Sequence, residues 1–219
     1  MNRASSDRYG AVAKLIDCGA HGPGSGAELF VVEGDSAAAS VARVRDPVTQ
    51  AVLPMQGKPL NAARASRDKV LAHPFFGPLV AALDVGCAAQ CDPRRMRYQR
   101  VLVLTDPDAD GIHCGFLVLL FFHRWLRPLL DAGRIEIVRP PWGEVVADGP
   151  PQLAFSEPEL GLLAARARQR GPATVRRFRG LAALDATLLR DACVAVGTRR
   201  STVVSAADVA AMIEVIDHL

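Results

Sequence analysis

Three aspartates occupy alternate positions in one short stretch of the sequence: Asp106, Asp108 and Asp110, followed directly by Gly111. Carboxylates this close together repel one another unless a cation or bound protons intervene. Their hard oxygen atoms suit Mg²⁺, which takes one or two protein carboxylates and keeps waters and substrate phosphates as its other ligands. The spacing therefore indicates a site for a divalent cation.

The same triplet is also typical of two different arrangements. Asp is favoured in turns and at the N-terminus of a helix, so the residues fit a turn and a helix cap equally well. The spacing also resembles the first half of an EF-hand calcium loop, with Gly111 in the expected place. The twelfth position of that loop, however, is Leu117 instead of Glu. On these residues alone, the cation site and the simple cap both remain open.

A second acidic segment follows another short apolar run. Residues 29–32 are apolar and end in Glu33, Gly34 and Asp35, and the aspartate triplet follows the apolar residues 101–104 in the same way. Apolar runs of this length, bounded by turn residues, are typical of buried strands. The carboxyl ends of parallel strands meet at one edge of a sheet, where ligands bind. We therefore predict that Glu33 and the aspartates share one site.

Six segments, in order along the chain, resemble the Toprim domain, and most closely that of the B subunits of bacterial type IIA topoisomerases (DNA gyrase and topoisomerase IV). The resemblance implies an α/β fold with a Rossmann-like, mainly parallel sheet flanked by helices and followed by a C-terminal helical tail. We expect strands at 29–32, 101–104 and 134–138, with helices on both faces, and one long apolar helix over 112–130. The segments are AKLIDC (13–18), ELFVVEGDSA (28–37), QAVLPMQGKPLN (50–61), RYQRVLVLTDPDADGIH (97–113), RPPWGEVV (139–146) and RRFRGL (176–181).

The resemblance also divides the chain into three parts. Residues 1–26 are polar and rich in glycine, and we expect them to be a flexible lead-in. Residues 27–146 correspond to the Toprim domain, and residues 147–219 to a C-terminal tail region resembling the end of the gyrase B subunit. No ATPase region precedes the Toprim segments in this sequence, so we expect that this chain binds no ATP.

In the family, the matching carboxylates bind divalent cations during DNA cleavage and rejoining. The resemblance implies that Glu33, Asp106 and Asp108 bind Mg²⁺ or Mn²⁺, that Asp110 supports them, and that all four are catalytic. It also implies that Glu33 acts as a general acid toward the leaving sugar oxygen. The chemistry requires a cation because the transferring phosphate must be neutralised and its oxygens oriented.

Two further residues are candidates for DNA contacts. Lys58 is expected to contact phosphate as a point charge, although a solvated surface lysine is the alternative. His113 is expected to contact DNA or to support a metal ligand, and a capping or packing role is equally open. DNA binding is expected to be weak because the family usually has basic residues at three positions that differ here: Gln56, Gly115 and Glu144.

The composition limits the class of protein but does not indicate a particular reaction. The chain has 219 residues and a net charge of only +3, which does not by itself indicate nucleic-acid binding. Its five cysteines form no paired framework, which favours a reducing compartment. The N-terminus lacks an apolar signal core, and the longest apolar run, residues 116–122, is too short to span a bilayer. We therefore expect a cytoplasmic protein without a membrane partner.

The two tyrosines, Tyr9 and Tyr98, do not stand in a recognisable nucleophile motif. In the family, a tyrosine on a separate subunit attacks the DNA, so the resemblance implies DNA and a gyrase A-like, tyrosine-bearing subunit as partners. We therefore expect a stand-alone Toprim protein that resembles the cleavage and religation module of a type II DNA topoisomerase. A metal-dependent DNA nuclease, and a non-catalytic accessory module that binds topoisomerase or DNA, are the alternatives.

Overall fold

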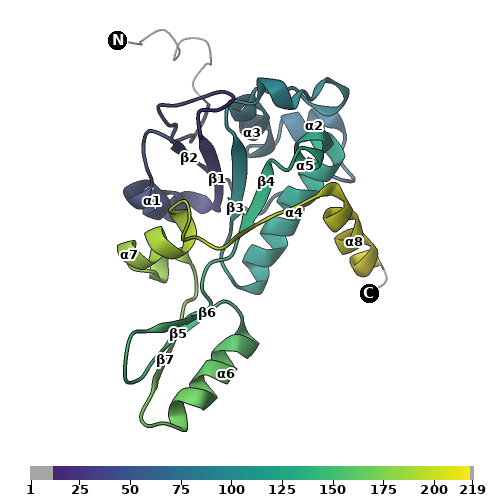
Figure 1. Ribbon diagram of the computed structural model, residues 1–219. Coiled ribbons are helices and arrows are strands. Elements are labelled where there is room, and N and C mark those ends of the chain that lie inside the picture. The colour runs from purple at the N-terminus through teal and green to yellow at the C-terminus, as the bar shows by residue number, and fades with distance from the viewer. Residues whose placement is uncertain (1–11, 218–219) are drawn as a thin grey trace.

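A five-stranded sheet forms the centre of the computed structural model, which describes residues 12–217. The first four strands are parallel and the fifth pairs antiparallel with the fourth, so the predicted α/β fold with a mainly parallel sheet is confirmed (Figure 1). The strands lie in the order β2 (Gln50–Met55), β1 (Glu28–Glu33), β3 (Arg100–Leu104), β4 (Ile135–Val138) and β8 (Ser201–Val203).

The three predicted strands are β1, β3 and β4, which lie side by side in the middle of the sheet. Their residues are in register: Val31 pairs with Val103, and Val103 pairs with Ile137. Parallel strands covered on both faces are apolar at successive positions instead of alternate ones. For this reason, continuous apolar runs marked β1 and β3 in the sequence, whereas β4 alternates apolar residues with Glu136.

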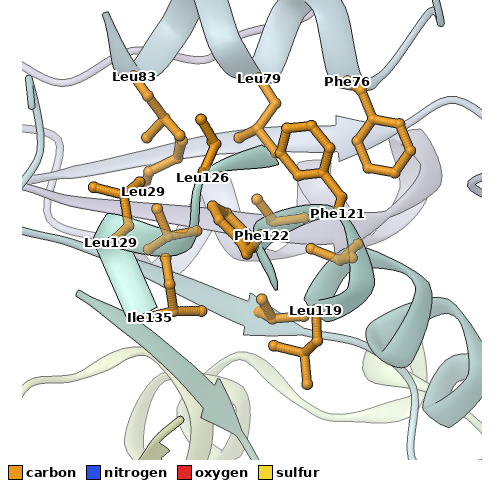
Figure 2. Close-up of a cluster of buried hydrophobic side chains, with 14 of the residues drawn as sticks. Leu29, Phe76, Leu79, Leu83, Leu119, Phe121, Phe122, Leu126, Leu129 and Ile135 are labelled. Carbon is orange, nitrogen blue, oxygen red and sulfur yellow. The ribbon is translucent and has the colours of Figure 1, made fainter. Parts of the chain in front are cut away.

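One face of the sheet packs against a group of helices. Figure 2 shows part of this core, in which the rings of Phe76 and Phe121 stack with centroids 4.4 Å apart and Phe122 belongs to the same buried cluster as the strand residue Leu29. The C-terminal helix, the predicted helical tail, packs against α4 and α5. The helices of this face are α2 (Arg67–Leu71), α3 (Phe76–Leu83), α4 (Ala109–Trp125), α5 (Arg127–Asp131) and α8 (Ala206–Asp217).

The sequence predicts one long helix over 112–130, and this is wrong. The structure instead contains α4 and α5, separated at Leu126, whose φ of −133° and ψ of 34° lie outside the helical range. The cause is Pro128, which has no backbone N–H and whose ring would clash with the carbonyl four residues earlier if the helix continued.

The opposite face of the sheet is covered by α1 (Gly34–Val44), α7 (Ala186–Leu189) and the turns that surround α7. Here Phe30 and Leu102 from the strands are buried together with residues from the region 178–194. Residues in the predicted C-terminal tail region therefore complete the hydrophobic core on this side. The buried residues from that region are Phe178, Leu181, Leu184, Leu189, Ala192, Cys193 and Val194.

A small separate sheet lies below the main one in Figure 1. It has the strand order β6 (Gln152–Ala154), β5 (Gly143–Val146) and β7 (Thr174–Arg177), with α6 (Glu157–Arg168) packed against it. Glu144, at the position where the family usually has a cation, is largely buried and forms an ion pair of 3.0 Å with Arg176 on the neighbouring strand.

Part of the predicted flexible lead-in is packed against the main sheet. Ile16 forms an antiparallel bridge with Val52, and Cys18 is buried in the core. Residues 1–11 of that lead-in, including Tyr9, lie outside the described residues. All five cysteines are free, and four of them are buried. Within residues 12–217, no helix is both long and apolar enough to span a membrane.

Candidate metal and DNA site

Glu33 and Asp106 lie together at the carboxyl edge of the sheet. Glu33 ends β1, Asp106 lies two residues after the end of β3, and the two strands are paired neighbours. Oε1 of Glu33 accepts a hydrogen bond of 2.9 Å from the backbone N–H of Asp106. The structure therefore joins these two predicted site residues directly.

Asp108 caps the helix that begins at this edge. Its Oδ1 accepts a hydrogen bond of 2.8 Å from the N–H of Gly111 in the first turn of α4. A Cβ atom at Gly111 would lie 2.2 Å from the carbonyl oxygen of Asp106 and 2.6 Å from Oε1 of Glu33. Glycine is therefore required for α4 to start so close to both residues. The helix-cap role is confirmed for Asp108, whose carboxylate keeps further lone pairs for a cation.

The negative charge of this group is only partly compensated. Burial raises the pKa of Glu33, and the carboxylates of Asp106, Asp108 and Asp110 raise it further, against the lowering effect of the Asp106 N–H. Burial also raises the pKa of Asp106, and the charge of Asp108 adds to this effect. Both groups therefore hold a proton more readily than exposed carboxyls, and a bound cation would relieve the repulsion.

Asp110 and Lys58 form an exposed ion pair beside the carboxylates. Nζ of Lys58 lies 2.8 Å from Oδ1 of Asp110, and both side chains are about half exposed or more. The pKa of Asp110 is lowered by this hydrogen bond and by the positive charge of Lys58, and the pKa of Lys58 is raised correspondingly. Since exposed ion pairs contribute little stability, Lys58 can exchange Asp110 for a phosphate at small cost.

A cavity of about 1060 Å³ adjoins the carboxylates, between α4, the end of β4 and α8. Most of its walls are apolar, but Asp106, His113 and Arg139 also line it. His113 is exposed near the start of α4, so the structure places it near the site without giving it a packing role. Arg139 is an exposed cation in this cavity that the sequence did not single out, because it stood inside a motif without an assigned role.

The segment RRFRGL also reaches the site, and the sequence alone gave it no role. The N–H of Leu181 donates a hydrogen bond of 2.8 Å to Oδ1 of Asp106. The motif was recognisable in the sequence, but a backbone donor leaves no residue-type signal. Its place beside Asp106 could therefore be seen only in the structure.

Asp17, Cys18 and His21 form a different group of potential metal ligands. Among residues 12–217, these are the three side chains whose ligand atoms all lie within 4.8 Å of one another. The guanidinium of Arg97 lies 2.6 Å from Oδ2 of Asp17 and 2.9 Å from Nε2 of His21. The hydroxyl of Tyr98 donates a hydrogen bond of 2.7 Å to Oδ1 of Asp17. Burial raises the pKa of the Cys18 thiol to about 11, which disfavours the thiolate that metals bind. These residues form a hydrogen-bonded ion-pair cluster, and the positive charge of Arg97 opposes a cation there.

The carboxylate oxygens of the predicted ligands Glu33, Asp106 and Asp108 do not all lie within 4.8 Å of one another. Their chemistry nevertheless fits a hard divalent cation, because all three supply carboxylate oxygens and two of them have raised pKa values to which charge crowding contributes. Asp108 is exposed at the helix start, and only its Oδ1 is engaged by the Gly111 N–H. The residues present therefore fit Mg²⁺ or Mn²⁺.

Comparison with known proteins points to one family. Residues 28–140 match the Toprim domain. The DNA gyrase B subunit of Halalkalibacterium halodurans is 34% identical over 186 residues, which cover 85% of this chain and 29% of that protein. The corresponding protein of Treponema pallidum is 34% identical over 187 residues, with the same coverage of 85% and 29%. That of Staphylococcus epidermidis is 35% identical over 176 residues, covering 80% of this chain and 27% of its own length. The chain spans less than a third of these relatives.

Proposed function

The chain belongs to the Toprim family, and on this basis we propose that it is a Mg²⁺- or Mn²⁺-binding module for DNA cleavage and rejoining. In this proposal it works as the corresponding region of the DNA gyrase B subunit would, with a gyrase A-like subunit that supplies the attacking tyrosine. The observation that carries the proposal is the hydrogen bond between the Asp106 N–H and Glu33, which brings the carboxylates of two strand ends into one site.

Each residue has a distinct task in this proposal. Glu33, Asp106 and Asp108 hold the cation, and Asp110 keeps Lys58 next to it through their ion pair. The bound cation supplies charge neutralisation at the transferring phosphate and orientation of its oxygens. The raised pKa of Glu33 supports its role as the general acid that protonates the leaving sugar oxygen.

The surroundings of the site support a DNA backbone as the ligand. Lys58 pairs with Asp110, and His113 and Arg139 line the same cavity as Asp106. Phosphate contacts from such side chains position DNA without reading its sequence. Glu144 does not add an opposing charge, because its carboxylate is used by Arg176 in the small sheet. The exchange of the family's usual cation for Glu144 therefore removes one contact without placing an anion against DNA.

We also propose the division into a lead-in (1–26), a Toprim domain (27–146) and a tail region (147–219), with the chain acting in the cytoplasm. The tail region supports the domain, since residues such as Phe178 and Leu189 are buried against β1 and β3.

A second candidate is an accessory module or a nuclease that acts without the tyrosine-bearing partner. It is favoured by the replacement of a family cation by Gln56, whose amide hydrogen-bonds locally to the carbonyl of Met55. The loss of this positive charge lowers the affinity for DNA, which must stay bound while its strand is broken.

Cleavage assays on supercoiled plasmid separate these functions. The chain is mixed with a gyrase A-like subunit and Mg²⁺, and protein-linked breaks are trapped by denaturation. The proposed function predicts breaks that need both proteins and disappear in Glu33→Gln. Nicking by the chain alone, without protein-linked ends, would support the nuclease instead. Partner or DNA binding without any break would support the accessory module.

A further inference from the structure

The segment after β7 covers the carboxylate of Asp106. Leu181 donates its backbone N–H to Oδ1 at 2.8 Å. A Cβ atom placed on Gly180 would lie 2.6 Å from Oδ2, 2.9 Å from Cγ and 3.1 Å from Oδ1 of the same carboxylate. This segment lies outside residues 28–140, which match the Toprim domain, yet it makes direct contact with a predicted metal ligand.

We propose that Gly180 and Leu181 are positioning residues of the metal site, which hold the Asp106 carboxylate in the orientation that accepts the cation. Gly180 provides the space for this close approach, and Leu181 provides the hydrogen bond. The inference rests on the proposed function, because it assumes that the cation binds at Asp106.

The segment is itself fixed on both sides of Gly180. Phe178 and Leu181 are buried, with 5% and 1% of their surface exposed, in the core on the α1 side of the sheet. The N–H of Phe178 donates to the carbonyl of Trp142 at 3.0 Å, and the N–H of Ala183 donates to the carbonyl of Gly180 at 3.0 Å. A donor held this firmly restricts the rotation of the side chain that accepts its bond.

Asp106 needs such a restraint because its neighbours repel it. The charge of Asp108 acts on Asp106, and without a partner the carboxylate would turn away from the other acidic groups. A carboxylate has about four lone-pair sites, so the bond from Leu181 leaves others for a cation. Partners of this type orient metal ligands, and their loss typically lowers metal affinity by about 10- to 100-fold.

Glycine at position 180 is required for space and not for backbone conformation. Its φ of 173° and ψ of 174° are extended values that other residues also adopt. The substitution Gly180→Ala therefore tests the contact with Asp106 directly. A matched control is Gly161→Ala, because a Cβ atom at Gly161 in α6 would meet nothing within 4 Å.

The first test is calorimetric titration of Mn²⁺ into the wild type, Gly180→Ala and Gly161→Ala, together with their melting temperatures without metal. We expect Gly180→Ala to bind Mn²⁺ at least about tenfold more weakly, with Gly161→Ala unchanged. Equal Mn²⁺ affinity of folded Gly180→Ala and the wild type would overturn the inference and leave the proposed function intact. Absence of Mn²⁺ binding by the wild type would overturn both.

The second test uses only the wild type and decides the matter if Gly180→Ala does not fold. Mg²⁺ is added while the backbone amide signals are followed by NMR. The Leu181 amide should shift, since its acceptor becomes a metal ligand. The Leu188 amide, which donates to Oδ1 of Asp185 at the same distance of 2.8 Å, should not shift. Shifts at Asp106 and Asp108 with an unchanged Leu181 amide would contradict the inference.

Discussion

Nζ of Lys58 lies 2.8 Å from Oδ1 of Asp110, although the two residues are 52 positions apart in the sequence. This ion pair connects the loop after β2 with the first turn of α4 and places the lysine beside the acidic edge of the sheet. It is exposed, so it contributes little to stability and leaves the lysine available to a ligand.

The substitution Lys58→Ala should weaken DNA binding to a similar degree for all sequences. It should also reduce the magnitude of the negative slope of log affinity against log salt by about 1, as expected for one lost phosphate contact. Fluorescence anisotropy with a labelled duplex at several salt concentrations measures this slope. Lys69→Ala, which removes another exposed lysine on α2, is the control and should leave it unchanged. An equal slope in Lys58→Ala and the wild type would exclude the phosphate contact.

Mg²⁺ should raise the melting temperature of the wild type, because a ligand that binds the folded state stabilises it and relieves carboxylate repulsion. The rise should be smaller in Asp108→Ala, which removes one predicted ligand. Asp148→Ala, in a loop of the small sheet region, should respond like the wild type. The same rise in all three proteins would argue against Asp108 as a ligand.

Acidification should destabilise the protein through Asp17. Burial alone would raise the pKa of Asp17, but hydrogen bonds from His21, Tyr98 and Arg97 outweigh it and lower the pKa from 3.8 to about 2. A lowered pKa in the folded state adds stability that is complete above the unfolded pKa and is lost as the pH falls through the folded one. The loss should therefore occur between pH 3.8 and about pH 2.

Because the Asp17 side chain is 37% exposed, solvent screening reduces this contribution to about 1 kcal/mol. Urea unfolding at pH 7, 4 and 2.5 measures it. Asp17→Asn should show a correspondingly smaller decrease over the acidic interval. A decrease identical to that of the wild type would show that Asp17 is not the group responsible.

Glu144→Lys, which restores the family's usual charge, should destabilise the protein instead of improving DNA binding. The position is largely buried and lies 3.0 Å from Arg176, so a lysine would place two positive charges together. We expect a loss of about 1–3 kcal/mol in the free energy of unfolding. Tighter DNA binding without loss of stability would contradict the placement of Glu144 inside the small sheet.

The central strands and the meeting of Glu33 with Asp106 could be predicted from sequence because both depend on local signals. Uninterrupted apolar runs mark β1 and β3, which are buried on both faces, and parallel strands bring their final residues to one edge. The family resemblance supplied the same fold and assigned roles to the carboxylates.

Other features depend on contacts that the sequence does not encode locally. Asp17 accepts a hydrogen bond from Arg97, which is 80 positions away in the sequence. Because this partner is distant, the segment around Asp17 gave no signal beyond its polar, glycine-rich composition. The contact of Leu181 with Asp106 is made by a backbone N–H that every residue except proline has. The helix break at Leu126 was visible in principle, since Pro128 follows it, but the long apolar run obscured that signal.

The central claim is that Glu33 and Asp106 bind one divalent cation together. Calorimetric titration of Mg²⁺ and Mn²⁺ into the wild type, Glu33→Gln, Asp106→Asn and the control Asp148→Asn tests it most directly. Gln at position 33 still offers an oxygen to the Asp106 N–H, so the variant removes the charge while the geometry is kept. We predict saturable binding by the wild type and the control, and affinity at least about tenfold lower in the other two. Unchanged affinity in Glu33→Gln and Asp106→Asn would contradict the shared site.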